Sequence, residues 1–202
     1  MKNIIVILGL LISSLTVFSQ SNNTVDEKRL KLGFNLGVNH SILFSPDELP
    51  SFASISNDLG VRLGVLADYQ LFKFLSISPK AELSFNNNEL NLTFNDDAQY
   101  RYQVLPISLE FMTHFIFKKK NEKVSPYFYF GPNLKIPISD KSVNYPEPSV
   151  FAIDVGIGLE KAFEHFNFSP ELRYSYGLTD VIITPTIRPL RFHSVSLIFN
   201  FM

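Results

Sequence analysis

Apolar residues occupy every second position in eight stretches of this chain. In the C-terminal stretch, His193 to Met202 (HSVSLIFNFM), Val195, Leu197, Phe199 and Phe201 alternate with polar residues such as serine and asparagine. Because successive side chains of an extended strand point to opposite faces, this alternation predicts a β-strand with one apolar face. The other seven strands are predicted over residues 31–44, 60–71, 74–86, 102–117, 125–138, 150–163 and 166–178.

The connections between the predicted strands alternate in length. Short connections are expected at residues 72–73, 118–123 and 164–165, and long ones at 45–59, 87–101, 139–149 and 179–190. Transmembrane barrels have this asymmetry, with short periplasmic turns at one end and longer extracellular loops at the other. We therefore predict an all-β fold, an eight-stranded antiparallel up-and-down transmembrane β-barrel in the outer membrane of a Gram-negative bacterium.

Closure of such a barrel requires the last strand to pair with the first, because an open sheet edge in hydrocarbon leaves backbone groups without hydrogen bonds. A register that places Leu32 near Phe201 also places His40 near His193 at the extracellular rim.

The N-terminal segment has the features of a secretory signal peptide. It carries a positive charge at Lys2, an apolar run from Ile4 to Ile12, and the small-residue pattern Val17-Phe18-Ser19. We predict a signal peptide over residues 1–19 and a barrel domain over 20–202, in which residues 20–30 form a short periplasmic segment. The apolar run is shorter than the ~20 residues that a membrane-spanning helix needs, so no transmembrane helix is predicted.

Composition excludes several classes of protein. The chain contains no cysteine, which rules out a disulfide scaffold, a cysteine nucleophile and a thiolate metal site. Its net charge is −1, without a large basic block, so we do not expect nucleic acid as a partner.

A soluble barrel or sandwich is the main structural alternative, since its apolar side chains would alternate in the same way and face a core. The opposite face of the strands favours the membrane, because it carries mid-strand glycines: Gly33, Gly37, Gly64, Gly131, Gly156, Gly158 and Gly177. Glycine weakens a solvated strand, but in a narrow lumen it makes room for a long neighbour. We expect Gly64 opposite Glu82, Gly158 opposite Arg173, and the apolar face in contact with outer-membrane lipid.

Nine charged residues share the inward face of the predicted strands. They are four bases and five acids: Arg62, Lys80, Glu82, Glu110, Lys135, Asp154, Glu160, Glu171 and Arg173. Eight strands leave an interior that side chains just fill, and buried charges persist when they are paired. We predict a structural ion-pair network that fills the lumen. A path for protons or ions is the alternative interpretation.

A hydrolase or acyltransferase at the barrel rim is another alternative. Such a site needs a nucleophile, a base and an orienting acid in hydrogen-bond reach, for which His40, Ser41, Thr179 and Asp180 are candidates. His40 and His193 fall on the outward-facing side of their strands, where histidine marks the polar interface band. We therefore predict no catalytic, cofactor or metal site.

Three segments resemble the PorT-like family of outer-membrane β-barrel proteins. They are RYSYGLTDV at residues 173–181, LPISLEF at 105–111 and ISPKAELSF at 77–85. The chain departs from the family where an acidic residue followed by Ile-Pro is usual, because it has Val104-Leu105-Pro106. Its last residue is Met202, so Phe201 is expected to serve as the aromatic signal in the C-terminal strand that the barrel-assembly machinery reads.

The resemblance implies a role that is accessory to secretion or envelope organisation, since the founding member of that family is tied to secretion across the outer membrane. Envelope or secretion proteins are then the expected partners. From the lumen we predict a non-enzymatic protein that acts through its loops or partner proteins. The alternative is a passive small-solute channel, although aqueous porins have sixteen or more strands.

Overall fold

The computed structural model describes residues 30–45, 49–93, 99–119, 124–138, 148–182 and 190–202. The predicted signal peptide and most of the predicted periplasmic segment lie outside these residues. Among these residues there is no candidate for a membrane-spanning helix.

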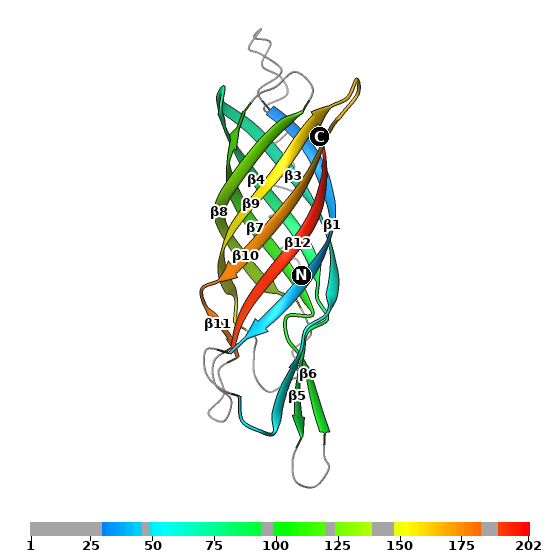
Figure 1. Ribbon diagram of the computed structural model, residues 1–202, viewed down its shortest axis with the longest axis vertical. Coiled ribbons are helices and arrows are strands. Elements are labelled where there is room, and N and C mark those ends of the chain that lie inside the picture. Colours follow the sequence, from blue (N-terminus) through cyan, green and yellow to red (C-terminus); the bar gives the residue numbers. More distant parts are fainter. Residues whose placement is uncertain (1–29, 46–48, 94–98, 120–123, 139–147, 183–189) are drawn as a thin grey trace, which may run out of the picture.

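Eight long strands form the wall of a barrel. They are β1 (Leu30–Phe44), β3 (Leu59–Phe72), β4 (Leu75–Phe85), β7 (Ile107–Lys118), β8 (Ser125–Pro137), β9 (Val150–Ala162), β10 (Asn167–Gly177) and β12 (Leu190–Phe201). Each strand pairs antiparallel with the next one along the wall, and β1 also pairs with β12, which closes the ring. The predicted eight-stranded antiparallel barrel is confirmed. In Figure 1 the short turns lie at the top and the long connections at the bottom.

The seam between β1 and β12 has a different register from the one expected. Phe34 lies opposite Phe201, and Ile42 lies opposite His193, so the pairing is displaced by two residues. Because side chains alternate with a period of two, this displacement changes cross-strand neighbours but leaves the inward and outward faces as predicted.

Short strands occupy the long connections. β2 (Ala53–Ser56), β5 (Glu89–Thr93) and β6 (Gln99–Gln103) form a separate three-stranded sheet with β5 in the middle, and β11 (Asp180–Ile182) pairs with the start of β12. These four strands were not predicted, because each has three to five residues and too few alternations to show a period.

The fourth predicted strand, residues 102–117, is wrong at its start. Tyr102 belongs to β6, and the wall strand β7 begins only at Ile107. The break is at Leu105, whose φ of 50° lies in the left-handed region that side chains other than glycine rarely adopt. Leu105, expected to face outward, is instead buried with 1% of its surface exposed.

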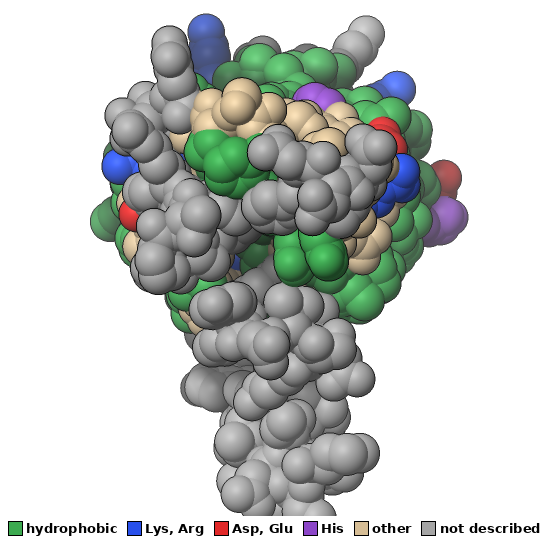
Figure 2. Space-filling model, turned by 90° about the horizontal axis from the view of Figure 1, so that it is seen from below, with side chains coloured by type: hydrophobic (Ala, Val, Ile, Leu, Met, Phe, Trp, Pro, Cys, Tyr) green, Lys and Arg blue, Asp and Glu red, His purple; other side chains and the backbone are tan. Residues whose placement is uncertain are grey.

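The two faces of the wall differ in chemistry. On β1, Leu32, Phe34 and Leu36 are exposed on the outside, whereas Asn35 and Asn39 are buried on the inside. Figure 2, which views the long-loop end, shows hydrophobic side chains along the outer circumference of the barrel. An exposed apolar surface of this extent suits a hydrocarbon environment and not water.

Candidate functional site

Glu82 is the hub of the ion pairs in the lumen. Its carboxylate accepts two parallel hydrogen bonds from the guanidinium of Arg173, at 2.8 and 2.9 Å, and a third from Arg62 at 3.0 Å. The amide of Asn35 donates to the same carboxylate at 2.9 Å. Because β1, β3, β4 and β10 each contribute one of these side chains, the cluster crosslinks distant parts of the wall. The paired geometry of Arg173 with Glu82 is the strong, bidentate form of this interaction.

A second group of contacts surrounds Glu110 and Asp154. Lys135 donates to Glu110 at 3.1 Å, and the amide of Asn133 bridges Glu110 and Asp154 at 3.0 and 3.1 Å. Nε2 of His114 lies 3.1 Å from Asp154, and the His114 ring stacks on Tyr129 at 4.6 Å between centroids. This packing fills the cross-section between β7, β8 and β9.

Glu171 completes the middle of the lumen. Lys80 donates to both of its carboxylate oxygens, at 3.1 and 2.9 Å, and the hydroxyl of Tyr127 donates at 3.0 Å. Arg173 lies 3.8 Å from the same carboxylate and so connects it with the Glu82 hub. Eight of the nine predicted charged residues belong to these contacts. Together with Asn35, His114 and Asn133 we call them the charged middle: Arg62, Lys80, Glu82, Glu110, Lys135, Asp154, Glu171 and Arg173.

Glu160, the ninth predicted residue, lies apart from the charged middle. It pairs with Lys31 at 2.8 Å and with Lys118, which also lies 3.5 Å from Asp68. This periplasmic cluster is near the short-turn end. Lys31 and Lys118 raise the four predicted bases to six, and Asp68 raises the five predicted acids to six. The numbers of basic and acidic side chains in the described ion pairs of the lumen are therefore equal.

Sequence reasoning missed these three residues although a signal was present. Asp68 continues the inward side of β3 two positions after Leu66, Lys118 follows Ile116 in the same way on β7, and Lys31 precedes Gly33 by two positions on β1. The prediction of a short connection over residues 118–123 places Lys118 in a turn, whereas β7 extends to include it.

The extracellular end of the lumen is filled by hydrophobic side chains, which were not predicted. We call this group the mouth cluster: Leu43, Leu90, Leu92, Val104, Leu105, Val150, Val181, Leu190 and Phe192. It combines inward residues of wall strands with residues of β5, of β11 and of the segment before β7. Asn86 holds that segment in place by donating to the carbonyl of Leu105 at 2.8 Å.

The charged middle and the mouth cluster are in direct contact. The ammonium of Lys135 lies 5.4 Å from the centre of the Phe192 ring, within the range of a cation–π interaction. Neutral polar side chains also connect the two regions, because Ser84 accepts from Arg62 at 3.5 Å and donates to Asn86 at 3.1 Å, and Asn86 contacts Leu105.

Glycines make room for the tyrosines of β8. Gly64 lies opposite Glu82 as expected, but Gly156 faces Arg173, and Gly158 faces Glu171, a displacement of two residues from the predicted pairing. A Cβ atom on Gly156 would collide with the ring of Tyr129, and one on Gly158 with the ring of Tyr127. The small residues therefore admit aromatic rings from the neighbouring strand as well as charged side chains.

The candidates for a rim hydrolase do not converge. His40 is exposed on the outside, while Ser41 is buried on the inside and donates its hydroxyl to Asn86 at 3.0 Å. The hydroxyl oxygen of Thr179 accepts the backbone N–H of Phe151 at 3.0 Å, and Asp180 lies 3.6 Å from Arg191. Within the described residues, no group of three His, Asp or Glu side chains is arranged to hold a metal ion.

Comparisons with known proteins agree with this architecture. A family model described as outer membrane protein beta-barrel domain matches residues 18–182. The structure is similar to that of Neisserial surface protein A (NspA), with a TM-score of 0.51 and 13% identity, covering 85% of this chain and 97% of that one. It is also similar to OprG from Pseudomonas aeruginosa, with a TM-score of 0.51 and 11% identity, covering 85% and 92%. No curated protein matches the chain in sequence.

Proposed function

Because the chain belongs to the outer membrane protein beta-barrel domain family, we propose that it is a non-enzymatic scaffold that presents its extracellular segments to partner proteins. The observation that carries this proposal is the filled lumen. The charged middle and the mouth cluster occupy successive levels of the same bore, and most of their side chains are buried. Because the lumen of such a barrel is filled, contacts with other molecules must be made by its outer surface and its loops.

The extracellular three-stranded sheet is the best-placed surface for a partner. All five residues of its edge strand β6 are exposed, and Tyr100 and Tyr102 flank Arg101 along it. Tyrosine and arginine are enriched at the centres of protein interfaces, and an edge strand has backbone groups to share. We place the functional contact on this strand.

The partners follow from the same proposal. Outer-membrane lipid surrounds the apolar wall, and the barrel-assembly machinery engages the C-terminal strand β12. Envelope or secretion proteins are the functional partners, in keeping with the resemblance to the PorT-like family, and nucleic acid is not among them.

A complementation experiment tests the proposal. In a strain lacking the gene, we expect particular secreted or surface proteins to be lost and the wild-type chain to restore them. A variant carrying Tyr100→Ala, Arg101→Ala and Tyr102→Ala should assemble as a heat-modifiable barrel but fail to restore them. The matched control, Gln99→Ala with Gln103→Ala in the same strand, should complement. Full complementation by the triple variant would exclude β6 as the functional surface.

The alternative of a passive channel has a direct test in planar bilayers. A filled lumen predicts no steady single-channel current of porin size from the wild-type protein. A steady current would favour the channel and contradict the scaffold.

A further inference from the structure

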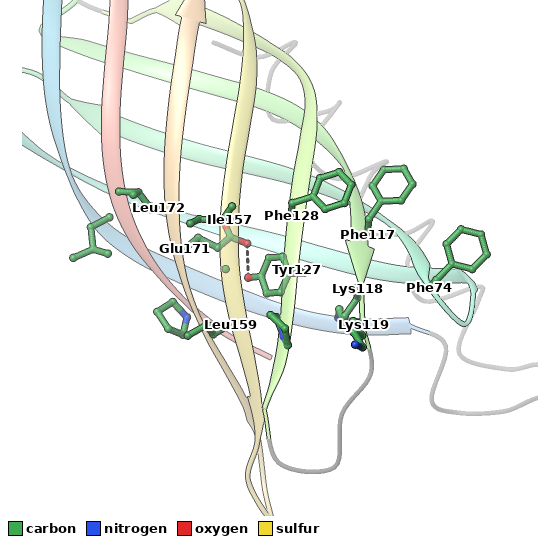
Figure 3. A pocket seen from close by; sticks show the side chains of 14 residues that line it. Phe74, Phe117, Lys118, Lys119, Tyr127, Phe128, Ile157, Leu159, Glu171 and Leu172 are labelled. Carbon is green, nitrogen blue, oxygen red and sulfur yellow. Dashed lines mark hydrogen bonds between the residues drawn. The ribbon is translucent and has the colours of Figure 1, made fainter.

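A groove of about 780 Å³ lies on the wall of the barrel near its periplasmic end. Apolar side chains that point outward from β7, β8, β9 and β10 form most of its lining, and Figure 3 shows them from close by. They include Phe117, Phe128, Ile157, Leu159 and Leu172. A hollow of this size and chemistry on a membrane-facing wall suits a hydrocarbon chain.

Two prolines weaken the wall beneath the groove. Pro126 of β8 is paired with Leu159, and Pro170 of β10 lies on the other side of the same residue. Proline has no N–H and cannot donate to the strand ladder. The register of β9 with β10 accordingly passes from Phe168 opposite Lys161 to Glu171 opposite Gly158, without pairs between them.

The inner side of the groove is closed by a polar contact. Tyr127 and Glu171 face the lumen, line the groove from within, and are joined by the hydrogen bond drawn in Figure 3. The groove therefore ends at the charged middle and does not continue into an open bore.

Positive charge lies at the periplasmic edge of the groove. Lys119 lines the groove and is exposed, and Lys161 is exposed two positions beyond Leu159 on the outward side of β9. Lys73 in the turn before β4 is also exposed, against one exposed acidic side chain, Glu164, among the described residues of this end. An apolar groove with cationic groups at its edge matches an amphiphile with an anionic head.

We propose that the groove binds an acyl chain of an anionic phospholipid of the periplasmic leaflet, whose phosphate pairs with Lys119 and Lys161. The short turns are periplasmic in barrels of this kind, so these lysines lie at the level of the headgroups. Lys161 is held near that level by the ring of Phe163, whose centre is 4.8 Å from its ammonium. This site is on the opposite end of the barrel from β6 and does not depend on the proposed scaffold function.

Tryptophan fluorescence can test the site, because the chain contains no tryptophan. Phe128→Trp places the single reporter in the groove, and Leu63→Trp places a comparison reporter on the outward face of β3, away from the groove and nearer the middle of the wall. Each variant is refolded into vesicles that contain phosphatidylglycerol or phosphatidylethanolamine with brominated acyl chains, which quench tryptophan on contact.

The measured quantity is the mole fraction of brominated lipid that gives half-maximal quenching. At Phe128→Trp we expect this mole fraction to be lower for phosphatidylglycerol than for phosphatidylethanolamine, by a factor of about five for each lysine. At Leu63→Trp the two lipids should quench alike. Adding Lys119→Gln and Lys161→Gln to Phe128→Trp should abolish the preference, while Arg191→Gln at the other end should leave it intact. Equal quenching at Phe128→Trp, the same preference at both reporters, or a preference that survives loss of both lysines would each overturn the proposal.

Discussion

The charged middle and the mouth cluster fill the same narrow bore by opposite means. In the middle, Arg62, Glu82 and Arg173 are almost fully buried, and the carboxylate of Glu82 accepts hydrogen bonds from both guanidinium groups. In the mouth, Leu105 and Phe192 are buried to the same extent but contribute no charge. Removing one charged partner leaves another uncompensated, whereas removing an apolar side chain leaves only a void. The two regions should therefore fail in different ways when they are mutated.

The largest effect is expected from Glu82→Gln. The change leaves Arg62 and Arg173 buried without their common carboxylate, and breaking a buried pair in this way costs about 3–5 kcal/mol. The urea midpoint of the barrel refolded into lipid vesicles, followed by heat-modifiable migration on a gel, measures the loss.

Asp180→Asn is the matched control for Glu82→Gln. Asp180 pairs with Arg191 near the extracellular rim, where both side chains are more than a third exposed, so the loss should stay below about 1 kcal/mol. Equal midpoints for the two variants would show that the charged middle is not what holds the wall together.

Phe192→Ala tests the mouth cluster and should cost about 3 kcal/mol through the cavity it leaves. The same measurement applies, with Phe128→Ala as control, because lipid replaces that outward ring. We also expect the bilayer current to stay at the wild-type level, since the charged middle still fills the bore. A current that rises in Phe192→Ala would mean that the mouth cluster alone closes the lumen.

The smallest effect is expected from Lys31→Ala in the periplasmic cluster. Lys31 is 31% exposed at its side chain, and Lys118 remains as a partner for Glu160, so the loss should be below about 1 kcal/mol. A shift in midpoint as large as that of Glu82→Gln would place this cluster among the main crosslinks of the wall.

Eight charged residues of the charged middle follow from the sequence because strand alternation alone assigns a side chain to the inside, whereas the roles of Asn35, His114 and Asn133 do not. Glu82, Glu110 and Arg173 each lie on a long strand with many alternations, so their orientation follows from counting. Register is harder to predict. The two-residue displacements at Gly158 and at His193 depend on how far neighbouring strands slide past each other, which short turns restrict only locally.

Strand alternation could not predict the mouth cluster. Leu105 lies in a stretch whose alternation continues across the end of β6 and the start of β7, so the pattern indicated one strand where the chain has two. Its inward position depends on a left-handed backbone conformation and on the hydrogen bond from Asn86, a residue at the other end of the same connection between β4 and β7. A contact of that kind is visible only in three dimensions.

The pairing of β1 with β12 makes formation of the wall all-or-none. Phe34 and Phe201 are neighbours across the seam although nearly the whole barrel sequence lies between them. Until β12 pairs with it, β1 has unpaired backbone N–H and C=O groups along its edge, and hydrocarbon offers them no hydrogen-bond partners. Pairings between residues so far apart in the sequence also form slowly. We therefore expect a chain truncated before β12 to lack a closed wall and to leave its apolar residues open to aggregation, and not to form a smaller barrel.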